Sequence, residues 1–191
     1  MKSVFLKRAA IVVIAAVTMC VLANAQSPTF VKGDNVAGLG IGFGGYLYTG
    51  SGYTSKMPAI SVYYENCIID NLWDEKSSLG VGGMLGYTSA KWEHNDYGWK
   101  YTNIIFGARG TLHYAFVDKL DTYTGIMLGY NIVSDKEIGN HPRESLGSPD
   151  KSTPTWNWFL GARYYFTDNF AAFAELGYGV TIFNVGVSIK F

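Results

Sequence analysis

The sequence predicts an all-β protein, an eight-stranded antiparallel transmembrane up-and-down β-barrel. Hydrophobic residues alternate with small or polar residues in eight separate runs, which is the period of a strand with one apolar face. Charged residues within these runs fall on the phase opposite to the hydrophobic one, and many of the 23 glycines share that charged phase. Together these observations favour strands whose apolar face points out of a narrow, closed barrel.

The alternating runs follow one another along the chain. They cover the ranges 36–48, 60–65, 79–87, 104–114, 125–131, 158–166, 170–178 and 183–191. In the first run Leu39, Ile41 and Phe43 alternate with glycines, and in the last run Val185 and Val187 alternate with polar residues or glycine. A tilted strand needs roughly ten residues to cross the hydrocarbon layer, and the runs approach that length.

A soluble barrel and a membrane barrel show the same alternation, and the side on which the charges lie distinguishes them. A soluble barrel buries its apolar phase, whereas a membrane barrel turns that phase to lipid and encloses the charged one. Glycine on the charged phase favours the membrane barrel, because it saves space in a narrow lumen. We therefore expect six side chains to point into the lumen: Glu65, Arg109, His113, Arg163, Glu175 and Lys190.

The first 25 residues have the layout of a cleaved signal peptide, which leaves residues 26–191 as one barrel domain. Lys2, Lys7 and Arg8 precede an uncharged apolar stretch at 9–22, and Ala23-Asn24-Ala25 has the small residues of a cleavage site. Cleavage leaves 12 basic against 15 acidic residues, a net charge of −3. A mildly acidic chain without a basic run gives no reason to expect a nucleic-acid partner.

The lengths of the connections predict which end of the barrel faces the exterior. With a periplasmic N-terminus, the external connections are 49–57, 90–101, 134–154 and 179–181, and the periplasmic ones are 69–77, 117–121 and 167–169. Outer-membrane barrels combine long external loops with short periplasmic turns. The assignment follows this rule, except that the first periplasmic connection is long and the last external one is short.

The charged residues of the lumen are expected to pair with one another, because an unpaired buried charge is costly. Glu65 and Glu175 with Arg109, Arg163 and Lys190 therefore predict an interior ion-pair network. Such a network either plugs and stiffens the barrel or lines a polar path for ions and small solutes. An eight-stranded lumen is only just wide enough for its own side chains, which favours the plug.

The sequence does not predict an enzyme, a metal site or a cofactor. His94, His113 and His141 share no metal-ligand spacing with a pair of cysteine, aspartate or glutamate residues. Gly40-x-Gly42-x-x-Gly45 matches a dinucleotide-binding pattern, but that site requires a helix directly after it, and alternation continues instead.

One predicted external loop has the composition of a recognition surface. The segment 91–100 combines aromatic residues with charges of both signs. Trp92, Tyr97 and Trp99 are therefore candidates for contact with a surface partner. Tryptophan and tyrosine at this level are equally expected as anchors in the membrane interface.

The chain resembles the small outer-membrane barrels of the OmpA/OmpX-like superfamily, especially the porin-family proteins of Bacteroidetes-type bacteria. The signal peptide, the Gly-Tyr pairs at strand ends and the segment 168–179 carry this resemblance. The final strand, with Val187, Ile189 and the terminal Phe191, resembles the assembly signal of the superfamily. The resemblance implies a place in the outer membrane in contact with its lipid, periplasmic chaperones as partners, and insertion by the barrel-assembly machinery.

The leading functional expectation is a non-enzymatic outer-membrane barrel that serves envelope structure or makes surface contacts through its external loops. The alternative is a narrow porin for ions or small solutes. A lipid-modifying barrel enzyme and a soluble lipocalin-like carrier are further alternatives. No motif identifies a ligand for the loops.

Overall fold

The computed structural model describes residues 29–45, 53–94, 97–138 and 152–191, so the predicted signal peptide 1–25 lies outside the described residues. The regular structure in these ranges consists of nine β-strands: β1 (Asn35–Phe43), β2 (Tyr53–Lys56), β3 (Ala59–Asp70), β4 (Ser77–His94), β5 (Tyr97–Val117), β6 (Leu120–Ile138), β7 (Thr153–Tyr165), β8 (Phe170–Gly179) and β9 (Phe183–Lys190). A helix with the length and apolarity of a transmembrane span does not occur among the described residues.

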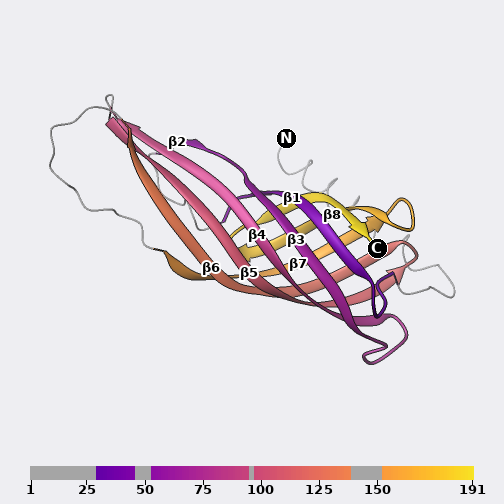
Figure 1. The fold of residues 1–191 in the computed structure, drawn as a ribbon. Coiled ribbons are helices and arrows are strands. Elements are labelled where there is room, and N and C mark those ends of the chain that lie inside the picture. The colour runs from indigo at the N-terminus through magenta and orange to yellow at the C-terminus, as the bar shows by residue number, and fades with distance from the viewer. Residues whose placement is uncertain (1–28, 46–52, 95–96, 139–151) are drawn as a thin grey trace, which may run out of the picture.

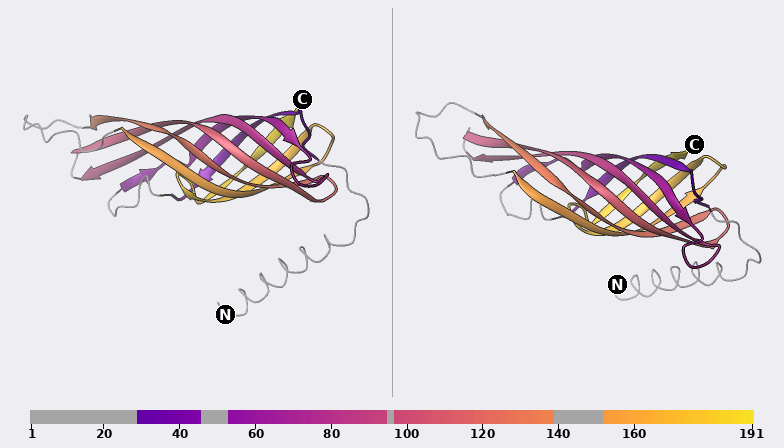
Figure 2. Two further views of the ribbon diagram at one scale, coloured as in Figure 1. Left: turned by 90° about the horizontal axis from the view of Figure 1, so that it is seen from below. Right: turned by 60° about the horizontal axis from the view of Figure 1, so that its bottom comes forward.

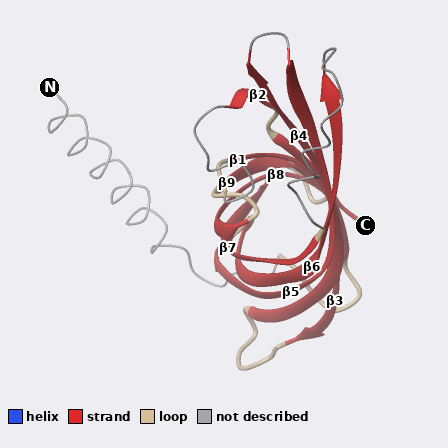
Figure 3. Ribbon diagram, turned by 90° about the vertical axis from the view of Figure 1, so that its left-hand side faces the viewer, coloured by secondary structure: helices blue, strands red, loops and turns tan. Residues whose placement is uncertain are grey.

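The strands form one antiparallel sheet that closes on itself as a barrel (Figures 1 and 3). The order around the barrel is β1, β3, β4, β5, β6, β7, β8 and β9, and β9 pairs with β1 to complete the circle. The short strand β2 pairs with β4 beyond the end of β3, so β2 and β3 act as one strand interrupted at Met57-Pro58. The predicted eight-stranded antiparallel barrel is confirmed.

The hydrophobic phase of the strands lies on the outside of the barrel. Leu39, Val62 and Phe106 point outward and are 51%, 46% and 43% exposed, whereas Arg109 and Glu175 are each 5% exposed in the lumen. This arrangement is opposite to that of a soluble barrel and is the one that a lipid environment favours.

Two small apolar clusters fill the lumen between the charged residues. One contains Phe30, Val36, Tyr63, Cys67 and Phe173, and the other contains Ile105, Tyr123, Met127, Phe159 and Val180. Most of these residues are at inward-facing positions of several strands, whereas Phe30 precedes β1 and Val180 lies between β8 and β9. Aromatic rings and charged side chains therefore share the core. The lumen is therefore a packed interior and not a wide pore.

Three strands continue well beyond the barrel at one end (Figures 1 and 2). β4, β5 and β6 contain 18, 21 and 19 residues, about twice the number that a tilted crossing needs. β6 pairs with β7 only as far as Asn131, and β4 pairs with β3 only as far as Tyr87. Beyond these points, residues 88–94, 97–103 and 132–138 form what we call the projecting extension, with β2 along its β4 edge.

The projecting extension corrects the prediction that 90–101 is a loop. The pairing of β4 with β5 continues without a break to His94 and Tyr97, so most of this segment is strand. Alternation of polarity marks a strand only where its two faces meet different surroundings. Above the barrel both faces carry polar residues, and the backbone pairing persists after the hydrophobic pattern has ended.

The opposite end of the barrel carries short connections. Only Asp118 and Lys119 separate β5 from β6, since Val117 still pairs with Leu120. Residues 71–76 join β3 to β4, and residues 166–169 join β7 to β8. The C-terminus lies at this end (Figure 1). Following the rule that outer-membrane barrels have short periplasmic turns and long external loops, we call the end with the short turns the periplasmic end and the end with the projecting extension the external end.

Candidate functional site in the barrel lumen

The charged side chains of the lumen come from inward positions on five strands. The set comprises Glu65 on β3, Arg109 and His113 on β5, Asp121 on β6, Arg163 on β7 and Glu175 on β8. All six are at least 95% buried. A buried charge is tolerated only when it is paired and hydrogen-bonded, so the partners of each group decide what the lumen can do.

Four of these side chains, here called the lumen cluster, form a closed cycle of ion pairs: Glu65, His113, Asp121 and Arg163. His113 Nε2 lies 2.8 Å from Glu65 Oε1, and its Nδ1 lies 2.8 Å from Asp121 Oδ1. The Arg163 guanidinium donates through Nη1 to Asp121 Oδ2 and through Nη2 to Glu65 Oε2, each at 3.0 Å. Because β3 and β7 are four strands apart in the eight-stranded ring, the Glu65–Arg163 pair connects opposite walls of the barrel.

The geometry around His113 indicates the charge of the lumen cluster. Both ring nitrogens of His113 face carboxylate oxygens, and an ionised carboxylate can only accept hydrogen bonds. With both carboxylates ionised, both nitrogens donate and His113 carries a positive charge. Two carboxylates then face two cations, so the cluster is neutral as a whole, as a low-dielectric interior requires.

A second cluster, made up of Arg109, Tyr123, Glu175 and Asn184, is centred on a carboxylate. Arg109 Nη2 donates to Glu175 Oε1 at 2.8 Å, and the Tyr123 hydroxyl donates to the same oxygen at 3.0 Å. Asn184 Nδ2 donates to Glu175 Oε2 at 3.0 Å. The Arg109 guanidinium lies 4.2 Å from the centre of the Phe159 ring, which adds a cation–π contact.

The structure divides the predicted interior network into these two clusters and a separate pair at the periplasmic rim. Lys190 belongs to neither cluster. Its Nζ donates to the carbonyl oxygen of Thr29 at 3.0 Å and lies 3.6 Å from Asp34 Oδ2. The Lys190 side chain is partly exposed there, so its ion pair is a surface contact.

Two members of the lumen cluster are absent from the predicted network. His113 lies on the charged phase of its strand, but the sequence does not reveal its two carboxylate partners. Asp121 was assigned to a turn, although it is the direct cross-strand partner of Arg163. Asp121 can be recognised as a partner of Arg163 only when the register between β6 and β7 is known.

The lumen is filled on both sides of the lumen cluster. On the periplasmic side the buried Phe30 ring packs against the His113 ring, with 4.4 Å between the ring centres. On the external side Arg109, Asn157 and Glu175 border a cavity of about 20 Å³. Such a cavity holds about one water molecule, so the described residues leave no wide passage at this level of the lumen.

Glycine creates the space that the aromatic rings of the lumen occupy. A Cβ atom placed on Gly161 would lie 2.6 Å from the ring of Tyr123, which is fully buried and bonded to Glu175. We expect Gly161→Ala to lower the free energy of unfolding by about 1–3 kcal/mol, because the ring has no free space into which to move. Denaturant unfolding measures this loss. Gly110→Ala is the control, since a Cβ atom there meets nothing within 4 Å, and equal losses in both variants would contradict the expectation.

The predicted assembly-signal residues lie on the last strand and at its end. Val187 and Ile189 point outward from β9 and are exposed. Phe191 is exposed at the periplasmic end, where its backbone nitrogen and oxygen both bond to Asn35 at 2.9 Å.

The predicted recognition residues lie on paired strands and not in a loop. Trp92 and Trp99 are direct cross-strand partners in the projecting extension, and both are half-buried. Tyr97 begins β5, and its side chain lies outside the described part of the chain. A tryptophan pair on neighbouring strands stabilises the hairpin, which is a structural reason for the aromatic composition of this segment.

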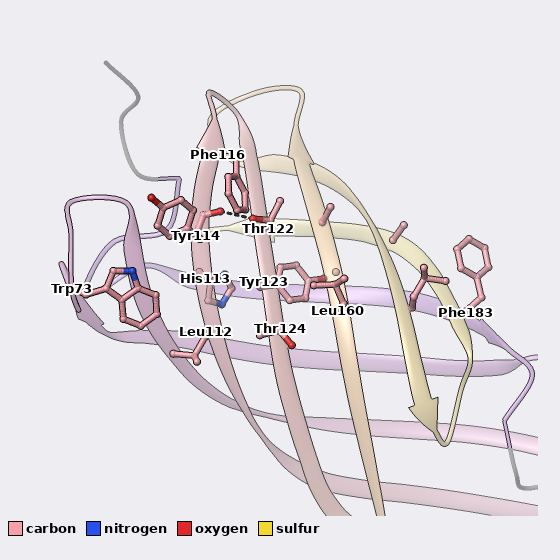
Figure 4. Close-up of a pocket in the computed structure, with 14 residues that line it drawn as sticks. Trp73, Leu112, His113, Tyr114, Phe116, Thr122, Tyr123, Thr124, Leu160 and Phe183 are labelled. Atoms are coloured by element: carbon pink, nitrogen blue, oxygen red, sulfur yellow. Dashed lines mark hydrogen bonds between the residues drawn. The ribbon is translucent and has the colours of Figure 1, made fainter. Parts of the chain in front are cut away.

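The outer wall carries a broad apolar groove near the periplasmic end (Figure 4). Small outward residues form its floor, with Thr122 opposite Ala162 and Ala162 opposite Ala174 on neighbouring strands. Larger residues such as Leu112 and Phe183 stand at its sides, and the groove has a volume of about 660 Å³. The groove lies on the outward apolar surface, and its lining also includes His113 and Tyr123, which belong to the two lumen clusters.

The histidine and carboxylates of the lumen contact one another and arginine. Among the residues that the structure describes, no group of three histidine, cysteine, aspartate or glutamate side chains is placed to hold a metal ion. Both nitrogens of His113 contact carboxylate oxygens, and the other oxygen of each of these carboxylates contacts Arg163.

No protein-family model matches this sequence, and no curated protein matches it. Solved structures are similar in fold. The crystal structure of Ail, the attachment invasion locus protein of Yersinia pestis, in complex with the heparin analogue sucrose octasulfate, matches with a TM-score of 0.52 and 13% identity over 84% of this chain and all of Ail. The outer-membrane protein OprG of Pseudomonas aeruginosa matches with a TM-score of 0.48 and 9% identity over 86% of this chain and 99% of OprG. The outer-membrane enzyme PagL matches with a TM-score of 0.42 and 15% identity over 82% of this chain and 96% of PagL. The match to Ail, together with the closed ring of eight strands, shows that the chain has the fold of a small eight-stranded outer-membrane β-barrel.

Proposed function

We propose that this chain is an integral protein of a bacterial outer membrane that makes surface contacts through its projecting extension, and that it is not an enzyme. The extension carries the proposal, because strands longer than a membrane crossing place paired, rigid backbone outside the lipid. The apolar outward face of the barrel supports insertion in lipid, and the signal-peptide pattern at 1–25 supports export.

The membrane location is tested by expressing the full chain in a Gram-negative host and fractionating the envelope. We expect the protein in the outer membrane, shortened at its N-terminus by cleavage near residue 25. Folded barrels often resist detergent until they are boiled, so unboiled samples should migrate differently from boiled ones in an electrophoresis gel. Recovery of a water-soluble protein without detergent would favour the lipocalin-like alternative.

The contact role is tested by shortening the projecting extension. Ala90 and Tyr101 are direct cross-strand partners, so an Asn-Gly turn can replace residues 91–100 and close the hairpin one step above them. We expect this variant to keep the heat-dependent gel mobility of the folded barrel and to lose attachment of the expressing cells to surfaces or to one another. Attachment equal to that of wild type at equal surface density would contradict the contact role.

The plugged lumen supports a contact role over transport. We expect the wild-type protein in planar lipid bilayers to give no stepwise conductance, because the two clusters and Phe30 occupy the lumen. Conductance steps that disappear in Arg109→Met would replace the contact role with that of a narrow porin.

The absence of catalysis is a separate part of the proposal. The lipid extract of cells that express the protein should contain the same lipid species as that of control cells. A new lipid A species that depends on expression would favour the lipid-modifying alternative.

We also propose that the barrel-assembly machinery inserts the chain after periplasmic chaperones deliver it. The exposed aromatic ring of the terminal Phe191 supports this role. We expect Phe191→Ala to reduce the amount of folded barrel in the membrane several-fold, because it removes the terminal ring and leaves the backbone bonds to Asn35 unchanged. Phe116→Ala, at an exposed ring of the same end, serves as the control, and equal reductions in both would contradict a specific signal.

A further inference from the structure

The outward face of the projecting extension carries a row of three lysines. Lys91 is the direct cross-strand partner of Lys100, and Lys100 is the direct partner of Lys136. Direct partners in an antiparallel sheet project from the same face, about 5 Å apart. Like charges in this arrangement repel one another. Lys91 already has Glu93 beside it, and three aligned ammonium groups still make this face favourable for additional anions.

The rows below the lysines show where the lysine row stands relative to lipid. The last large apolar row is Tyr87, Ile104 and Ile132, and these three residues are aligned as direct partners and exposed on the outside of the barrel. Two residues further along each strand, Ser89, Thr102 and Ser134 are aligned in a hydroxyl row. Two residues further again are Lys91, Lys100 and Lys136. No bulge interrupts the register across these rows, so all nine side chains share the outward face.

The order of the apolar, hydroxyl and ammonium rows matches the change from hydrocarbon to polar headgroups at a membrane surface. Strands rise about 3.4 Å per residue, so the lysines lie about 13 Å along the strands beyond the last apolar row. With a strand tilt of about 40°, this distance corresponds to about 10 Å of height above the hydrocarbon. The headgroup layer begins within that distance, and a lysine side chain is long enough to bend toward it.

Acidic side chains are sparse on this face. Among the described residues of the extension, the outward acidic side chain is Glu93, whose Oε1 lies 4.0 Å from Lys91 Nζ. Asp135 and Glu137 fall on the opposite phase of β6. The outward face at this height therefore has an excess of positive charge, although the whole mature chain has an excess of negative charge.

We propose that the lysine row binds the phosphate groups of lipid headgroups in the outer leaflet. The row is perpendicular to strands that are tilted by about 40°, so its three positions span roughly 6 Å in height. A lysine side chain is long and flexible enough to bring its ammonium group to the level of the lipid phosphates over that range. The site rests on the outer-membrane placement proposed above, but it is distinct from any contact that the tip of the extension makes.

The test measures lipid preference around the folded, full-length mature protein in phosphatidylcholine vesicles. Electron-spin-resonance spectra of spin-labelled phosphatidic acid and spin-labelled phosphatidylcholine give the ratio of their association with the protein. We compare wild type with K91Q/K100Q/K136Q. The matched control is K32Q/K76Q/K119N, which also removes three positive charges, all of them at the periplasmic end; asparagine replaces Lys119 because the φ angle there is 63°.

We expect wild type to prefer phosphatidic acid by at least about fivefold, and the lysine-row variant to lose most of that preference while the control keeps it. High salt should weaken the preference of wild type.

No preference in wild type, or equal loss in both variants, would overturn the proposal. So would displacement of the bound lipid by micromolar soluble polyphosphate, because it would identify a soluble polyanion as the better partner. Heat-dependent gel mobility of each protein in the same vesicles shows whether it is inserted, so failure of this site is distinguishable from failure of the membrane assignment.

Discussion

Replacing Arg163 with methionine should lower the free energy of unfolding by about 3–5 kcal/mol or prevent folding altogether. Arg163 is fully buried and donates to both carboxylates of the lumen cluster, Glu65 and Asp121, at 3.0 Å. Without the guanidinium, two carboxylates share one imidazolium, and the cluster carries an uncompensated negative charge away from water. Denaturant unfolding of the barrel in lipid vesicles, followed by tryptophan fluorescence, measures the loss.

Two further variants separate this explanation from a general loss of packing. In Glu65→Gln/Arg163→Met one carboxylate faces one imidazolium, so the double variant should recover more than half of the loss. Lys190→Met should cost less than about 1 kcal/mol, because that lysine forms a partly exposed pair at the rim. A loss below 1 kcal/mol for Arg163→Met, or a double variant less stable than the single one, would show that the cluster does not depend on charge balance.

The contrast between Arg163 and Lys190 shows how far the sequence predicts the lumen. Alternation along one strand is enough to place both side chains on the inward phase. It does not give the height of each residue in the barrel or the strand that faces it across the lumen. Glu65 and Arg163 are 98 residues apart in sequence and meet because β3 and β7 are on opposite walls. Those relations depend on the stagger of the strands around the barrel, which a period of two leaves open.

Asp121 illustrates a second limit, at the boundary between turn and strand. The sequence places Asp121 in the connection 117–121, because a polar residue at the start of a strand cannot be distinguished by residue type from a polar residue of the turn. The structure begins β6 at Leu120 and aligns Asp121 with Arg163. A shift of two residues in the strand boundary thus decides whether a carboxylate is solvated or belongs to the buried cluster.

The projecting extension shows the same limit at the other end of the strands. Backbone hydrogen bonds hold β4, β5 and β6 together above the barrel, and these bonds leave no trace in the pattern of hydrophobicity. The lysine row consequently cannot be read from the sequence, since its three members are separated along the chain and become neighbours only through the register. Fold class and the direction of the faces are predictable from residue type, while every site that joins several strands requires the register.

Substituting arginine for an outward-facing residue at mid-height of the barrel wall tests whether lipid surrounds the barrel. Ile126 and Ile132 lie on the same phase of β6, six residues apart, and are 52% and 44% exposed. Ile126 stands halfway between the periplasmic turn and the last apolar row, whereas Ile132 belongs to that row. In a bilayer, Ile126→Arg should lower the free energy of unfolding by about 2–4 kcal/mol and Ile132→Arg by about 0–1 kcal/mol, since the cost of a lipid-facing cation falls toward the interface.

The pair of isoleucines matches residue type, strand and approximate exposure. The two positions differ in depth and in their cross-strand neighbours, which are Gly110 and Trp158 for Ile126 and Ile104 for Ile132. If water surrounded the barrel, both substitutions would add a charge to a half-exposed surface position and would change stability by less than about 0.5 kcal/mol. Unfolding of both variants in phosphatidylcholine vesicles distinguishes the two environments. Equal, small effects would mean that the apolar face is covered by something other than hydrocarbon, and a large effect at Ile126 alone would mean that acyl chains surround it.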